Sequence, residues 1–128
     1  MERGQDEVRL DLPALPPFVR LARMAAASLA SRMGFNYDHI EDLRIAVDEL
    51  CFCLTGRRGR PGRIVLIYRM GPEGLRIDGV GPAASGATSP PVLTELSQRI
   101  LRAVADEHGV EAEDGQVRFH VVKRAQEA

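Results

Sequence analysis

The feature that most constrains the fold is an apolar stripe of helical period across residues 38–55, in a chain of 128 residues. A helix with one apolar face needs a sheet or other helices to cover that face. Because 45% of the chain is hydrophobic, a single domain of this length can supply that cover from its own core. We predict one domain over residues 1–128 with its core at about 8–124. The stripe consists of Ile40, Leu43, Val47, Leu50 and Leu54.

Two other helices are predicted from the same spacing. The first covers residues 17–33 and ends at Gly34, a residue favoured just after a helix. Asp38 and Glu41 resemble a capping box at the start of the helix over 38–55. The third helix is predicted to end near residues 108–109, with His108 favourably placed at its carboxyl end. Its apolar face consists of Leu93, Leu96, Ile100 and Val104.

Alternation of apolar and polar residues predicts the strands. It occurs at 8–12. The segment at 63–70 is a β-branched and aliphatic run, and after turn residues an extended pattern resumes at 75–81, as in a hairpin. Two more strands flank residues 114–115, with Val117, Phe119 and Val121 facing inward. The order β-α-α-β-β-α-β-β predicts an α+β fold. We expect a two-layer sandwich in which a mixed, mostly antiparallel sheet carries three helices on one face.

Charge and composition exclude several classes of function. The chain has 17 basic and 18 acidic residues and a net charge of −1, so it has no overall attraction for nucleic acid or an anionic membrane. No apolar run is long enough to span a bilayer, and we expect a cytoplasmic protein. Its only cysteines, Cys51 and Cys53, project about 200° apart on a helix, which disfavours a disulfide between them.

The helix over 38–55 carries the main candidate for chemistry. At 100° per residue, Asp42, Glu49 and Cys53 fall within about 40° of one another, beside the apolar stripe. One interpretation is a solvated acidic face with a small hydrophobe at its edge. The other is a pocket wall, in which a carboxylate activates a hydroxyl and the residue one turn later holds a metal ion. Cysteine is a poor ligand for Mg²⁺, which prefers hard oxygen.

Weaker candidates each have a plain structural interpretation. The glycines of residues 77–86 could allow a ligand close to the backbone, but such glycines are more often in a turn. The histidines, His39, His108 and His120, have no metal-like spacing, and Met24 is interpreted as core packing. Four arginines of the loop at 56–63 could meet phosphate or an acidic partner, or could simply be hydrated: Arg57, Arg58, Arg60 and Arg63.

The run IEDLRIAVDELCFCLTG, residues 40–56, resembles the second-helix motif of the GHKL ATPases, and specifically of the bacterial RsbW-like anti-sigma-factor serine kinases. The resemblance extends over about 8–124, because the order of elements is also that of this family. It implies the histidine-kinase-like ATPase fold. It also implies that Glu49 is the base acting on the attacking hydroxyl, and that Cys53 stands where the family has the asparagine that binds Mg²⁺.

The remaining motifs of the resemblance depart from the family pattern. Aligned on Gly79 and Gly81, the D-x-G-x-G box has Ile77 where the family has the aspartate that binds adenine, and Asp78 takes the unconstrained second place. Isoleucine cannot accept the adenine hydrogen bond. The lid segment at 87–98 has no glycine. The cofactor implied by the family is ATP or ADP with Mg²⁺, and the five pocket positions are Glu49, Cys53, Asp78, Gly79 and Gly81. We assign no metal site and no resident cofactor.

These losses lead to a prediction about function. The resemblance implies a bacterial regulatory protein that binds a sigma factor, a STAS-domain anti-anti-sigma protein, or both, and that can form a homodimer. Nucleotide binding and kinase activity are expected to be weak or lost, because phosphoryl transfer depends chiefly on positioning and charge stabilisation. The first alternative is an active ATP-dependent serine protein kinase. The second is a small-ligand sensor that reuses the emptied pocket.

Overall fold

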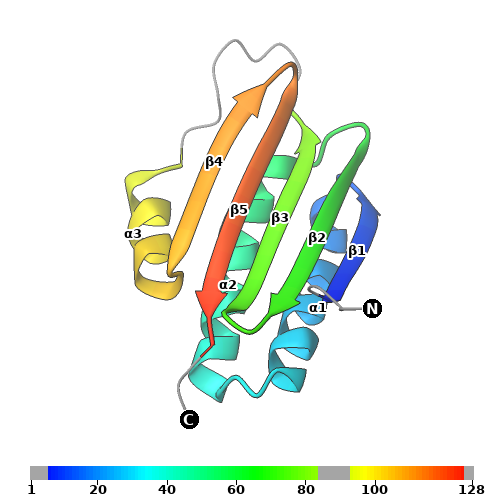
Figure 1. Ribbon diagram of the computed structural model, residues 1–128. Coiled ribbons are helices and arrows are strands. Elements are labelled where there is room, and N and C mark those ends of the chain that lie inside the picture. Colours follow the sequence, from blue (N-terminus) through cyan, green and yellow to red (C-terminus); the bar gives the residue numbers. More distant parts are fainter. Residues whose placement is uncertain (1–5, 84–92, 126–128) are drawn as a thin grey trace.

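The structure, a computed structural model, describes residues 6–83 and 93–125. Its five strands form one antiparallel sheet in the order β1-β2-β3-β5-β4, and the helices lie on one side of it (Figure 1). The predicted α+β sandwich is confirmed. The strands are β1 (Asp6–Pro13), β2 (Arg63–Gly71), β3 (Gly74–Pro82), β4 (Glu107–Glu113) and β5 (Gln116–Arg124).

The sheet is not mixed, because every pairing among the described strands is antiparallel. Two helices follow β1, α1 (Val19–Arg32) and α2 (Tyr37–Thr55), and they return the chain to the end of the sheet that it left. There the Ala14 N–H donates to the Gly62 carbonyl at 3.1 Å, so β2 begins beside the end of β1 and runs the opposite way. The other connections include two hairpins, β2–β3 and β4–β5, which are antiparallel by construction.

The helix ends differ from the predictions in two places. Asn36, rather than Asp38, caps α2: it has extended backbone angles, and its side chain accepts the His39 N–H at 2.8 Å. The third helix, α3 (Glu95–Val104), ends earlier than predicted because Ala105 is extended. His108 therefore lies in β4, not at a helix end, and its pKa is lowered by burial and by His120 and Arg102.

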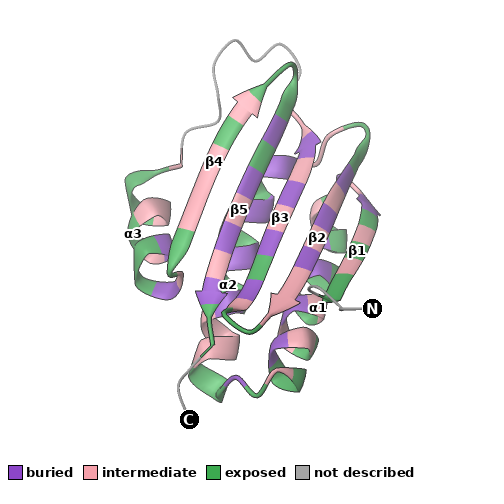
Figure 2. Ribbon diagram, viewed as in Figure 1, coloured by how far each residue is buried: buried purple, intermediate pink, exposed green. Residues whose placement is uncertain are grey.

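The core lies between the sheet and the helices. Inward-facing residues alternate along β2, β3 and β5, seen as purple bands in Figure 2, and Val117, Phe119 and Val121 are buried as predicted. The stripe of α2 is also buried at Leu43, Val47, Leu50 and Leu54.

Helix α1 differs from its prediction because it packs through small residues. Its buried face consists of Val19, Ala22, Ala26 and Ala30, and the Tyr68 hydroxyl donates to the Ala22 carbonyl at 2.8 Å. Alanine lets this helix approach the sheet closely. Met24 is 57% exposed, so its interpretation as core packing is wrong. No helix within the described residues is long and apolar enough to span a membrane.

Candidate functional site

Glu49 and Cys53 lie one turn apart on α2, at its border with α3 rather than on a solvated face. Glu49 is half-buried and Cys53 is 8% exposed. Burial raises the pKa of the Cys53 thiol, Arg60 opposes that rise, and Glu49 adds to it. A thiol held protonated is a poor metal ligand. Within the described ranges, no three His, Cys, Asp or Glu side chains are grouped to hold a metal ion.

The carboxylate of Glu49 is bonded to a hydroxyl of this chain. Ser97, in the first turn of α3, donates through Oγ to Glu49 Oε2 at 2.8 Å. Ser97 Oγ in turn accepts from the Thr94 hydroxyl at 3.0 Å, and Thr94 caps α3 by accepting the Ser97 N–H. A negative charge at a helix amino terminus is also favoured by the helix dipole. Glu49 is therefore a link between α2 and α3.

Asp42, the third residue of the predicted line, is engaged as well. Lys123 Nζ donates to Asp42 Oδ2 at 3.0 Å and to the Val104 carbonyl at 2.9 Å. Lys123 is the single lysine in the sequence, and its side chain is 9% exposed. This contact joins β5, α2 and the end of α3. The solvated acidic face predicted for α2 is therefore occupied by contacts to its neighbours.

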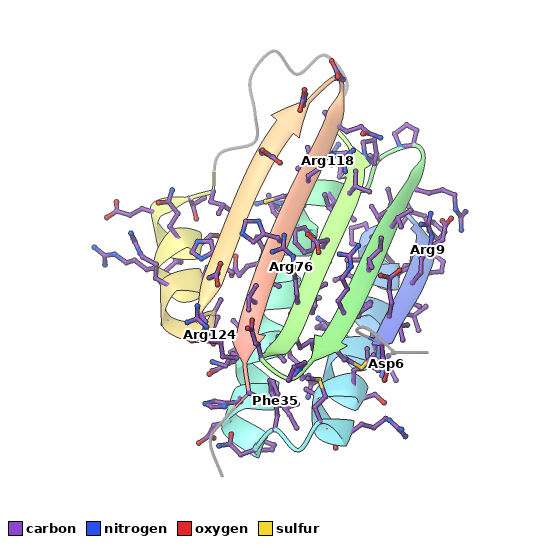
Figure 3. The ribbon with its side chains drawn as sticks, viewed as in Figure 1. Asp6, Arg9, Phe35, Arg76, Arg118 and Arg124 are labelled. Atoms are coloured by element: carbon purple, nitrogen blue, oxygen red, sulfur yellow. The ribbon has the colours of Figure 1, made fainter. Side chains whose placement is uncertain are left out.

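Strand β3 divides the predicted box between two faces of the sheet. Ile77, Gly79 and Gly81 face the helices, and Ile77 is completely buried. Asp78 faces the uncovered side, where it accepts from Arg69 at 2.8 Å and Arg76 at 3.0 Å. Figure 3 shows Arg76 over the strands on that side. The structure thus separates Asp78 from the other four pocket positions.

The two glycines of β3 are positions of close contact. A Cβ at Gly79 would overlap with the ring of Phe119 on the neighbouring strand. A Cβ at Gly81 would lie 2.8 Å from Ile64 Cγ2 and 3.3 Å from Leu54 Cβ, which is on α2. Both glycines therefore serve packing between β3, its neighbours and α2. The Phe119 ring fills the space beside Gly79 on the helix-covered face.

Arg60 anchors the arginine loop to the end of α2. Its Nη1 donates to the Cys53 carbonyl at 2.8 Å and to the Pro82 carbonyl at 2.9 Å, and so ties α2 to the end of β3. Arg63 pairs with Asp11 on β1 at 2.5 Å. Arg57 and Arg58 are exposed and form no hydrogen bond or ion pair with the part of the chain that the structure describes. Two of the four arginines, Arg60 and Arg63, therefore bind neighbouring elements, and the other two remain at the surface.

A hollow of about 310 Å³ lies on the uncovered face of the sheet, away from Glu49. Its floor is apolar, and Arg76 and Arg118, labelled in Figure 3, project from this face. Asp78 also lines it. Of the pocket positions predicted from sequence, Asp78 and the backbone of Gly79 border this hollow, whereas Glu49 and Cys53 do not.

Three contacts at the site were not predicted from sequence. Ser97 lies 48 positions from Glu49, and no local pattern joins them. The contact of Lys123 could have been predicted. Lys123 continues the inward alternation of Val117, Phe119 and Val121, and a lysine on that buried face needs a partner. The contacts of Arg60 could not have been predicted, since the loop sequence does not distinguish Arg60 from the neighbouring arginines. The first half of the predicted lid at 87–98, residues 87–92, lies outside the described residues, which resume at 93.

The layers and order of elements are consistent with a two-layer GHKL-like ATPase fold. No protein-family model matches the chain. The chain is similar to proteins named Serine-protein kinase RsbW: 45% identical over 51 residues to that of Bacillus subtilis (strain 168), which is 40% of this chain and 32% of the relative. The protein of Listeria monocytogenes serotype 4a (strain HCC23) is 52% identical over 49 residues, 38% of this chain and 31% of the relative.

A longer match is 33% identical over 82 residues to the Serine-protein kinase RsbW of Bacillus pumilus (strain SAFR-032), covering 60% of this chain and 51% of the relative. The matches therefore span about a third to a half of the length of these curated relatives. RsbW proteins are relatives of this chain over that part.

Proposed function

We propose that this chain is an RsbW-like anti-sigma regulatory protein of the bacterial cytoplasm that acts by binding. Its partners are a sigma factor, a STAS-domain anti-anti-sigma protein, or both, and it can form a homodimer. Nucleotide binding and kinase activity are weak or lost. The observation that supports the second part is that Ile77, which the resemblance aligns with the family's adenine-binding aspartate, has a completely buried side chain.

The other residues of the pocket also fit Mg²⁺ and a nucleotide poorly. Cys53 is a protonated, nearly buried thiol, and hard cations prefer oxygen ligands. The Phe119 ring fills the space beside Gly79, and Asp78 faces the other side of the sheet. A carboxylate base without a metal ion and a base-ring anchor lacks what phosphoryl transfer mainly requires.

An active serine kinase is the second candidate, and one contact favours it. Glu49 accepts a hydrogen bond from a serine hydroxyl at 2.8 Å, which is the contact that a general base makes with an attacking hydroxyl. The relatives are also named as a kinase. This candidate requires a nucleotide held by a different set of residues from those of the family motif.

Calorimetry with ADP and Mg²⁺ separates the two candidates. We expect no binding in the micromolar range for the natural chain, and an increase in affinity for Ile77→Asp combined with Cys53→Asn, which restores both family residues. Circular dichroism must show that the double variant is folded, since Ile77 is buried. The single variant Cys53→Asn provides a milder second test. Micromolar binding by the natural chain, together with ATP-dependent phosphorylation of a captured protein that Glu49→Ala abolishes, would establish the kinase candidate instead.

Partner capture tests the first part of the proposal. The natural chain, immobilised and exposed to the cytoplasm of its source, should retain a sigma factor or a STAS-domain protein. Cys53→Asn should change that capture little, because the nucleotide pocket is not used. Retention of neither class of protein would contradict the proposed function.

A further inference from the structure

Several exposed apolar side chains come from the 3₁₀ helix η1 (Pro16–Phe18) and the segments around it, from α1 and from the end of α2. The described residues include eight large apolar side chains that are exposed, and five of them come from residues 15–24 and 52. Among these five, Met24 and Phe52 have the most exposed side chains, at 57% and 55%. The five, which we call the α1–α2 patch, are Leu15, Phe18, Leu21, Met24 and Phe52.

One of the five, Phe52, borders a concave groove. A hollow of about 240 Å³ lies between η1, the start of α1 and the last turns of α2. Buried Val19 and Thr55 form part of its lining, and Phe52 forms part of its wall. Arg23 on α1 pairs with Asp48 on α2 at 2.7 Å, which fixes the two helices together along the groove. The groove can therefore receive an apolar side chain without rearrangement of its helices.

The surroundings of the groove are basic, although the whole chain has a net charge of −1. Segments 13–24 and 48–62, which form it, contain five arginines and two acidic residues. Asp48 is paired with Arg23, and Glu49 is bonded to Ser97. Arg20, Arg57 and Arg58 are exposed and have no ion-pair partner within the described residues. Arg57 lines the groove itself.

We propose that this groove binds an acidic amphipathic helix of a partner protein. An apolar side chain of that helix enters the hollow beside Phe52, and its carboxylates pair with Arg57 and Arg58. This inference deepens the proposed function and rests on it, because the groove is then the surface that a regulatory partner occupies. Complementary charge around an apolar anchor gives both a fast encounter and orientation.

The geometry favours a helix over the two other anionic partners. A lipid surface would meet a convex apolar face, whereas here the apolar lining is in a hollow and Asp48 lies within it. Nucleic acid needs a basic stripe that follows a phosphate backbone, and the aromatic residue in this groove stands alone on its wall. A helix supplies apolar anchors three or four residues apart with carboxylates between them.

The test uses the full chain and a synthetic acidic amphipathic peptide of about four helical turns, with leucine on one face and glutamate on the other. Fluorescence anisotropy should show binding that weakens as salt is added, and no binding of the same peptide with lysine in place of glutamate. Arg57→Glu with Arg58→Glu should weaken binding by at least about tenfold, and Phe52→Ser should have a similar effect.

Matched controls are Arg32→Glu, an exposed arginine at the other end of α1, and Tyr37→Ser, an exposed aromatic at the start of α2. Both should leave peptide binding unchanged. Because every substituted side chain is exposed, all variants should keep the thermal midpoint of the natural chain within a few degrees. Equal effects of the groove and control variants would overturn the inference, and so would binding of anionic vesicles but not of the peptide.

The outcomes also separate this inference from the proposed function. If the chain captures a sigma factor or STAS-domain protein and the groove variants do not change that capture, the groove is not the binding surface, but the proposed function holds. Groove-dependent binding of the acidic peptide by a chain that captures neither class would overturn the proposed function and keep the groove.

Discussion

The Ser97 hydroxyl donates to the Glu49 carboxylate at 2.8 Å, across 48 positions of the sequence. This bond ties the first turn of α3 to the middle of α2 and places a negative charge at the amino terminus of α3. The contact has the geometry of a base bonded to a hydroxyl, but in an active kinase the hydroxyl of a substrate would have to displace Ser97 from this carboxylate. Here its nearest hydroxyl is internal, so its first role is to hold two helices together.

Ser97→Ala should therefore destabilise the fold. The hydroxyl donates to a charged acceptor in a partly buried setting, so the free energy of unfolding should fall by about 1–2 kcal/mol. Urea denaturation measures this. The control is Ser31→Ala, an exposed serine on α1, which should change stability by less than about 0.5 kcal/mol. A loss no greater than that of the control would mean that Ser97 does not hold α3.

Lys123→Met should also destabilise the fold, since it leaves the Val104 carbonyl and Asp42 without their ammonium partner. We expect a loss of about 1–3 kcal/mol, because Asp42 keeps partial contact with water. A double-mutant cycle with Asp42→Asn isolates the pair. Strictly additive losses in the cycle would show that the two side chains do not interact.

Alkaline pH should weaken the fold through Tyr68 and Cys51. Burial raises the pKa of both groups, with a further rise from Cys51 at Tyr68 and from Asp48 at Cys51. A pKa that is higher in the folded state than in the unfolded state means that stability is kept below the unfolded pKa and lost as pH rises above it. Stability should therefore decline above about pH 9, near the ordinary pKa values of these groups.

Tyr68→Phe provides the control for this decline. Near neutral pH the variant should be less stable by about 1 kcal/mol, because the buried Ala22 carbonyl loses its hydrogen bond. Above about pH 10 the gap between variant and natural chain should shrink, since phenylalanine has no proton to lose. Urea midpoints at both pH values measure the gap, and a constant gap would contradict the role of Tyr68.

Gly79→Ala should be destabilising by about 1–3 kcal/mol, because its new methyl group would overlap with the Phe119 ring. Phe119→Leu, which replaces the ring by a smaller side chain, should recover part of that loss in the double variant. Thermal unfolding of the two single variants and the double variant gives the coupling energy. If the losses simply add, the ring does not occupy the space beside Gly79.

Local patterns sufficed for most of the fold. The stripe of α2, the two hairpins and the inward face of β5 all follow from periodicity, which depends only on near neighbours in sequence. Two errors have local causes of their own. Helix α3 ends early because the backbone of Ala105 is extended. Helix α1 packs through alanines, which allow close packing without large side chains, and Met24 therefore lies on its exposed side.

The site was harder to predict, because its contacts are long-range. The position of Glu49 on its helix face could be read from spacing, but its partner Ser97 could not. The strand periodicity does predict the orientation of Asp78. In a strand whose Ile77 and Gly79 face the core, residue 78 must face away from it. Which arginine of the loop would anchor the chain depended on the position of the Cys53 and Pro82 carbonyls in space.

The outer strand β4 carries Glu107, Glu111 and Glu113, all on the same side and all exposed. A second copy adding to this edge as a sixth strand would bring two rows of carboxylates together in a continuous sheet, which repulsion opposes. The β4 edge is thereby protected against the addition of a further strand, the usual hazard of an open sheet edge. A homodimer of this protein would have to be assembled through a face of the molecule or through its β1 side.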